Sequence, residues 1–86
     1  MLGAMSQATY QQQINFSVVV VSTKIEDMLK KGETHLFYSD IDDGDRQYRP
    51  CVLHKHVFDV VWALQRKYKG QVVVSRTPGG IVVDKI

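Results

Sequence analysis

The sequence has little cysteine, little proline and no long apolar run, and these shortages exclude whole classes of protein. Its single cysteine, Cys51, cannot form a disulfide within the chain, so the disulfide framework of small secreted domains is excluded. The longest apolar run is the four valines at 18–21, far short of the ~20 residues that cross a bilayer. We therefore expect a cytoplasmic domain with no membrane contact.

Recognisable catalytic and cofactor motifs are also missing. Gly79 and Gly80 lie between two predicted strands, so they do not form the glycine-rich loop that binds phosphate at a helix start. A calcium loop that starts at Asp40 fails at three positions of its register. Cys51 and His54 match no spacing typical of a zinc site or a cysteine nucleophile. We expect no cofactor and no metal, and an enzyme is the less favoured class.

The length of 86 residues allows one domain. Residues 1–13 show no apolar period and predict a disordered tail, and the residues before Met5 are typical of an expression remnant. Residues 14–86 then form a single α+β domain. So small a core is marginally stable alone, and association with another copy would stabilise it.

The first half of this domain predicts strand, helix, strand. Residues 14–22 are rich in β-branched side chains and predict a strand buried on both faces. A capping box begins at Thr23, so we expect a helix over 24–31. Residues 34–41 are aromatic and β-branched and predict the second strand.

The second half predicts strand, helix, strand, strand. The Asp-Gly pair within 42–45 favours a hairpin turn that leads into a strand at 45–49. Apolar residues at helical spacing predict a helix over 55–70. Residues 71–76 and 80–86 predict two strands joined by a Pro-Gly turn.

This order predicts a two-layer α+β sandwich, with two helices on one face of a mixed or antiparallel sheet. It is the ferredoxin-like order, strand-helix-strand-strand-helix-strand, with an extra C-terminal strand. Pro50 fits the central third strand of that order badly, so an alternative treats 43–55 as a loop. The last strand, 80–86, would lie at a sheet edge, where another copy can pair with it.

Charge is divided between two segments. Seven acids and two lysines lie between Glu26 and Asp45, which gives −5, and seven bases and one acid lie between Arg46 and Arg76, which gives +6. Such a dipolar chain favours a charged partner or a second copy. Alternatively, folding interleaves the two sets of charges and cancels them.

Trp62 is the leading candidate for a binding residue. It lies beside the apolar arc of its helix, next to Arg66 and Lys69, so it is either the margin of the core or an exposed anchor. If it is exposed, tryptophan with arginine has the composition of a protein-interface hot spot or of a nucleobase-stacking site. The candidate binding residues are Arg46, Tyr48, Arg49, Lys55, Trp62, Arg66, Lys67 and Lys69.

His54, Lys55 and His56 precede the second helix, where positive charge opposes the helix dipole. Either an anion binds there or the histidines stay neutral. We expect a small protein-interaction or regulatory module that self-associates through a sheet edge or helix face. The alternative is a nucleic-acid-binding module that uses the basic half from Arg46 to Arg76.

Overall fold

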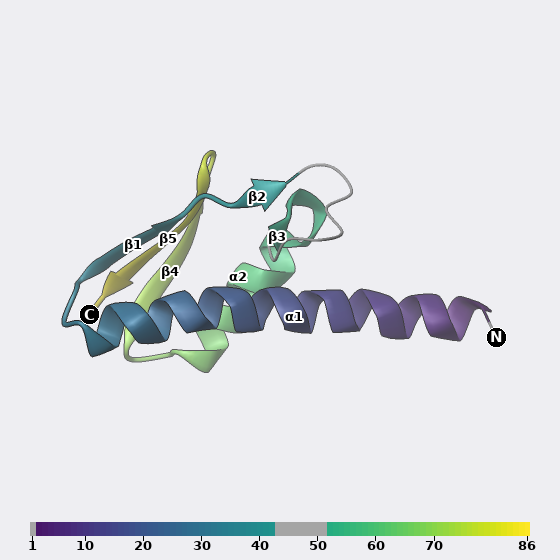
Figure 1. Cartoon of the computed structure of the whole chain (residues 1–86), viewed down its shortest axis with the longest axis horizontal. Coiled ribbons are helices and arrows are strands. Elements are labelled where there is room, and N and C mark those ends of the chain that lie inside the picture. The colour runs from purple at the N-terminus through teal and green to yellow at the C-terminus, as the bar shows by residue number, and fades with distance from the viewer. Residues whose placement is uncertain (1, 43–51) are drawn as a thin grey trace.

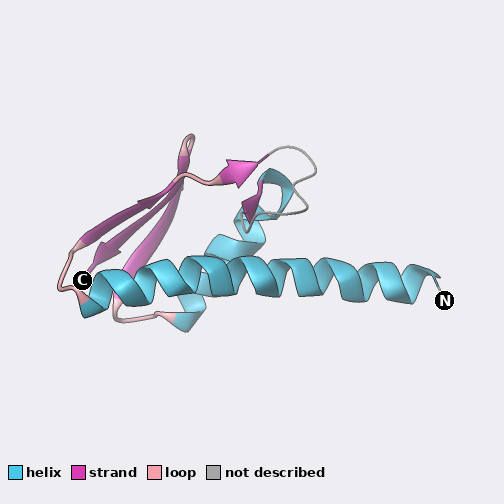
Figure 2. Ribbon diagram, in the orientation of Figure 1, coloured by secondary structure: helices cyan, strands magenta, loops and turns pink. Residues whose placement is uncertain are grey.

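The computed structural model describes the backbone of residues 2–42 and 52–86, with side chains from residue 10 onward. Figure 1 labels the helices and strands, and Figure 2 distinguishes them by colour. In chain order they are α1 (Leu2–Lys30), β1 (His35–Tyr38), β2 (Ile41–Asp42), β3 (Val52–Leu53), the 3₁₀ turn η1 (His54–His56), α2 (Val57–Lys67), β4 (Val72–Thr77) and β5 (Gly80–Lys85).

The architecture is a small α+β domain with two helices packed on a three-stranded antiparallel sheet. The strands lie in the order β1-β5-β4, and both helices lie on the same side of them (Figure 2). Along β4, Val72 and Val74 are buried and Val73 and Ser75 are exposed, as they are when one face of a sheet is covered. On β5, Ile81 and Val83 are buried and Val82 between them is half-buried. The predicted two-layer α+β class is therefore confirmed in outline.

The predicted strand over residues 14–22 is wrong, because these residues belong to α1. Buried positions in this segment follow the helical period: Ile14, Val21, Ile25 and Met28 are all buried. The β-branched residues lower helix propensity by only a few tenths of a kcal/mol each. Burying one large apolar side chain stabilises by ~1.5–3 kcal/mol, so packing outweighs propensity.

The helix also takes in residues 2–13, which the sequence predicts as a tail. The Tyr10 hydroxyl donates a 2.8 Å hydrogen bond to Asp59 Oδ2 and joins this part of α1 to α2. Because a helix replaces the first strand, the element order differs from the ferredoxin-like one. No helix in the described part of the chain is both long and apolar enough to cross a bilayer.

The second half agrees better with the sequence. The helix predicted over 55–70 is present as η1 and α2, and the strands predicted at 71–76 and 80–86 are present as β4 and β5. However, β5 is the central strand and not the predicted edge, since it pairs with β1 on one side and β4 on the other.

The short strands β2 and β3 pair in parallel, with Ile41 opposite Val52. They are therefore not the two arms of a hairpin, which are antiparallel. The predicted turn at 42–45 extends beyond the described residues, and the predicted strand at 45–49 lies wholly outside them. Val52 N–H donates to the Asp40 carbonyl at 3.1 Å. This bond holds β3 against the connection between β1 and β2.

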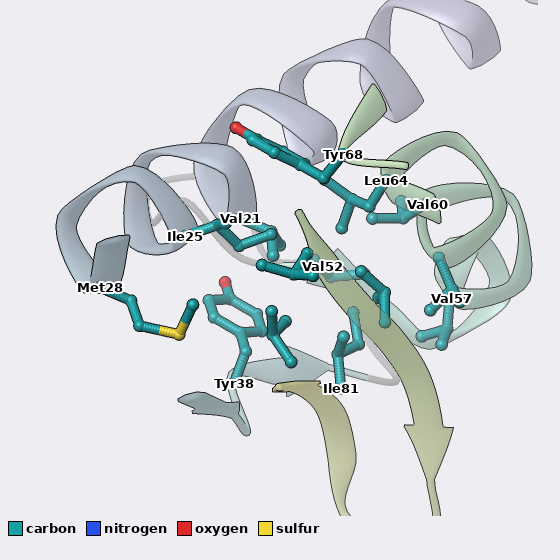
Figure 3. Packing of buried hydrophobic residues seen from close by; sticks show 14 of the residues in the cluster. Val21, Ile25, Met28, Tyr38, Val52, Val57, Val60, Leu64, Tyr68 and Ile81 are labelled. Atoms are coloured by element: carbon teal, nitrogen blue, oxygen red, sulfur yellow. The ribbon is translucent and has the colours of Figure 1, made fainter. Parts of the chain in front are cut away.

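The core lies between the helices and the sheet, and every layer contributes to it (Figure 3). Val21 and Ile25 of α1, Leu64 of α2, Val52 of β3 and Ile81 of β5 are fully buried. These residues come from segments that lie far apart in the sequence. Their packing together in one core fixes the positions of both helices on the sheet.

Gly80 occupies a position where no larger residue fits. A Cβ atom built there would clash with the backbone carbonyl oxygen of Tyr38, on the neighbouring strand β1. Backbone atoms inside a sheet cannot move aside as a flexible side chain can. At Gly79 the nearest atom to such a Cβ is the tip of the Phe37 ring at 3.3 Å, and that ring is half exposed.

We expect Gly80→Ala to destabilise the fold by about 1–3 kcal/mol, the usual cost of a strained backbone position, and Gly79→Ala to have a smaller effect. Urea unfolding followed by circular dichroism measures both. Equal stability of the two variants would contradict the close approach of β1 to Gly80.

Candidate interaction surface on helix α2

The outer face of α2 carries two large exposed aromatic side chains. Phe58 is 71% exposed and Trp62 is 59% exposed. They are four residues apart, so they are neighbours on the helix surface. The opposite side of α2 is used for the core and contributes the buried residues Val57, Val60, Val61 and Leu64.

Each of these rings has an arginine side chain over it. The Arg66 guanidinium carbon lies 4.6 Å from the centroid of the Trp62 ring. The Arg76 guanidinium carbon lies 4.4 Å from the centroid of Phe58. Such cation–π contacts are worth ~0.5–1 kcal/mol at exposed sites. We refer to Phe58, Trp62, Arg66 and Arg76 as the aromatic–arginine surface.

Arg76 reaches this surface because α2 packs on β4. The Gln65 side chain donates a 2.9 Å hydrogen bond to the Val74 carbonyl of β4, which joins the two elements directly. Along β4, Val72 and Val74 are buried, and Arg76 is the next residue of that alternation. Its side chain therefore extends toward the helix side of the sheet and lies over Phe58.

Trp62 is exposed and does not belong to the buried core. Of the other predicted binding residues, Arg66 lies over its ring. Lys55 and Lys69 are exposed. The predicted residues Arg46, Tyr48 and Arg49 lie outside the described residues.

Lys67 turns away from this surface and toward α1. Its Nζ donates to Ser22 Oγ at 3.2 Å and lies 5.5 Å from the centroid of the Tyr68 ring. The Tyr68 hydroxyl donates to Glu26 Oε2 at 2.7 Å. Burial, assisted by this hydrogen bond, raises the pKa of Tyr68. Lys67 therefore stabilises the contact between the helices instead of contributing to the outer surface.

Sequence reasoning missed Phe58 and Arg76. The helical spacing alone places Phe58 on the flank of the core stripe. Its exposure is indicated by its position four residues before Trp62, which puts both rings on the same face of the helix. The signal for Arg76 is its position in β4. A charged residue stands there at a position where the alternation of the strand predicts a buried side chain. Such an arginine must reach past the edge of the core to solvent.

A polar hollow of about 300 Å³ opens beside this surface. Arg76, Thr77, Ser39 and His54 contribute polar side chains to its lining. Asp59, in the first turn of α2, accepts the hydrogen bond from Tyr10, and that bond is the main cause of the raised pKa of Tyr10.

The three histidines do not form a common site. His35 Nδ1 lies 2.7 Å from Asp84 Oδ1 on the sheet, His54 is exposed, and His56 is buried. Because His56 is buried, the predicted anion site of His54, Lys55 and His56 does not form as one exposed cluster. Among the described residues, no three or more His, Cys, Asp or Glu side chains are grouped so that they could hold a metal ion.

His56 lies in the core without a hydrogen-bond partner. Neither ring nitrogen has a partner within the described parts of the chain, and the Tyr10 ring packs edge-on at 5.0 Å between centroids. Burial, together with the charge of Lys55, lowers the pKa of His56. The ring is therefore neutral in the fold, which agrees with the alternative of neutral histidines at this residue.

Comparison with known proteins adds no identification, because no family model, no curated protein and no solved structure matches this chain. The function of the chain is therefore inferred from the geometry of the aromatic–arginine surface.

We expect stability to fall as the pH drops below about 6.5, the ordinary pKa of histidine in an unfolded chain. The folded pKa of His56 is lower than this, so the unfolded state binds more protons in the interval between the two values. His56→Phe should remove this component, whereas His54→Phe, at an exposed position, should retain it. Urea midpoints measured from pH 7.5 to 5 compare the three proteins, and identical slopes for wild type and His56→Phe would contradict the assignment.

Proposed function

We propose that this chain is a small, non-enzymatic protein-interaction module that binds a partner through the aromatic–arginine surface of α2. The observation that carries the proposal is the pair of exposed rings, Phe58 and Trp62, each with a guanidinium group over it. Tryptophan and arginine are among the residue types that dominate the binding energy of protein interfaces.

The contacts between the arginines and the rings reduce the conformational entropy that is lost when a partner binds. Long arginine side chains normally lose much conformational freedom when a partner orders them. Here the contacts with Trp62 and Phe58 already restrict both guanidinium groups before any partner binds. The rings supply apolar area to bury, while the guanidinium N–H groups remain available for acceptors of the partner.

The chemistry of this surface selects a partner with carboxylates next to apolar side chains. Arginine binds carboxylates in a bidentate geometry that a point charge does not provide. Arg66 and Arg76 lie at two sides of the rings, and the hollow beside Arg76 offers the hydroxyl groups of Ser39 and Thr77. An acidic segment with one or two large apolar residues fits these features.

A nucleic-acid strand is the second candidate, because the same surface combines aromatic rings with arginine. Bases stack on exposed aromatic side chains, and arginine and lysine contact the phosphates. Lys55 and Lys69 are exposed on the same element or next to it. A protein partner is favoured because one face of each ring is already covered by a guanidinium group.

We expect Trp62→Ala and Arg66→Glu each to weaken binding of the captured protein partner by about 30-fold or more, the loss typical of a hot-spot residue. The partner is isolated by affinity capture with wild-type protein, and its affinity for each purified variant is measured by calorimetry. Val73→Ala, at a half-exposed position on the opposite face of the sheet, is the matched control and should bind like wild type. A partner that binds Trp62→Ala at full strength would overturn the proposal.

The nucleic-acid candidate has its own test. It predicts that wild-type protein is retained on single-stranded oligonucleotides at about 50 mM salt, with an affinity that falls steeply as salt is raised. The double variant Arg66→Glu with Lys69→Glu should lose this retention. No retention of the wild type would eliminate this candidate.

A further inference from the structure

The two edges of the sheet differ in how their backbone groups are satisfied. At the β4 edge, two of the backbone groups that point away from β5 have partners within the domain. Val72 N–H donates to the Tyr68 carbonyl at 3.3 Å, and the Val74 carbonyl accepts from Gln65 Nε2 at 2.9 Å. Helix α2 and the segment after it therefore cover part of this edge, whereas no described residue covers the outward groups of β1 in this way.

The β1 edge is open. Lys85 N–H donates to the Thr34 carbonyl at 2.9 Å, and Thr34 lies directly opposite Lys85 in the antiparallel register. Because hydrogen-bonded and non-hydrogen-bonded pairs alternate along such strands, the backbone groups of His35 and Phe37 point away from β5. Within the described residues, no hydrogen bond covers these groups.

A groove of about 620 Å³ runs beside this open edge, between α1 and β1. Val20, Thr23 and Lys24 form its helix wall, and Leu36 and Tyr38 contribute to its strand wall. The outer face of α1 next to it is apolar as well.

Phe16 is 55% exposed and Val19 is 57% exposed on that face of α1. With Val20 they have the spacing i, i+3, i+4 of an apolar stripe. An edge strand with free backbone groups next to an apolar helix face is suited to the addition of another strand.

We propose that a second copy of this chain occupies the groove, and that the two β1 strands pair antiparallel about a two-fold axis. In the register centred on Leu36, the N–H and carbonyl groups of His35 and Phe37 that point away from β5 all form hydrogen bonds with the second copy. His35 of one copy lies opposite Phe37 of the other, and each such pair exchanges two N–H···O bonds. Leu36 lies opposite Leu36 of the second copy, on the helix side of the sheet.

The charges at the two ends of β1 favour this antiparallel arrangement. Residues 30–33, which precede the strand, hold Lys30, Lys31 and Glu33, and residues 39–42, which follow it, hold Asp40 and Asp42. Lys31 also pairs with Asp27 of α1 at 3.1 Å. In the register centred on Leu36, Asp40 of one copy lies opposite Gly32 of the other, next to Lys31. A two-fold contact therefore brings residues 30–33, with a net charge of +1, opposite residues 39–42, with a net charge of −2, whereas parallel pairing would juxtapose like charges.

The inference adds a second contact to the module and does not depend on the aromatic–arginine surface. β1 and β4 are opposite edges of the sheet, and α2 packs on β4 (Figure 1). The pair of copies would form one continuous sheet with an α2 surface toward each end. A dimer of this kind presents two binding surfaces, which increases avidity for a partner with repeated sites.

The first test uses light scattering over micromolar to millimolar protein concentration. Wild type is expected to have the mass of a dimer at the upper end, and His35→Pro that of a monomer, because proline removes the outward amide hydrogen. Proline is tolerated at the first residue of an edge strand, and circular dichroism verifies the fold. His35→Ala is the matched control, since it also removes the side-chain pair with Asp84 but keeps the amide, and it should remain a dimer.

The second test remains informative if the proline variant fails to fold. In a Cys51→Ser background, Leu36→Cys should form a disulfide between copies on mild oxidation. Directly opposed residues of a non-hydrogen-bonded pair have Cα atoms about 4.5 Å apart, within the range of roughly 4.4–6.8 Å that disulfides span. Val73→Cys, an exposed position on β4, should not crosslink.

A monomeric wild type, a dimeric and folded His35→Pro, or crosslinking at position 73 instead of 36 would each overturn the proposed pairing. Trp62→Ala should dimerise like wild type. If that variant loses partner binding but still dimerises, partner binding and dimerisation use different surfaces, as the two proposals require.

Discussion

The packing of α1 against the sheet is the contact on which the rest of the fold depends. Ile14, Val21, Ile25 and Met28 form a buried stripe on the side of α1 that packs on β1 and α2. Without it the sheet would expose the part of its apolar face that α2 does not cover. The contacts of α1 with α2 depend on the same placement, because Tyr68 reaches Glu26 only when the two helices lie side by side.

Helix α2 contributes one side to the core, through Val57, Val60, Val61 and Leu64, and presents its aromatic residues on the other side. Its other side is held rigidly by the Gln65 bond to β4. Phe58 and Trp62 are therefore exposed on a fixed element, and rigid elements position binding residues more accurately than loops do.

Much of the second half of the fold could be predicted from the sequence, because its signals are local. Helix 55–70 has a clear apolar period, and a Pro-Gly turn separates the last two strands. In the first half, the strand predicted at 34–41 is present as β1, and the helix predicted at 24–31 lies within α1. The strand predicted at 14–22 is wrong because four consecutive valines favour a strand locally, whereas the period that buries Ile14 with Ile25 extends over a longer range. The sequence identified Trp62 and Arg66 but not Arg76, since the contact of Arg76 with Phe58 exists only once β4 lies under α2.

The central place of β5 has a consequence for how the chain acquires its structure. β5 is the last strand along the described chain, yet it pairs with both β1 and β4, and the partners His35 and Asp84 are 49 residues apart. During synthesis, neither outer strand has its sheet partner until β5 has left the ribosome. Pairing over such a sequence separation is slow compared with helix formation. A truncation that removes β5 would leave both outer strands without their sheet partner.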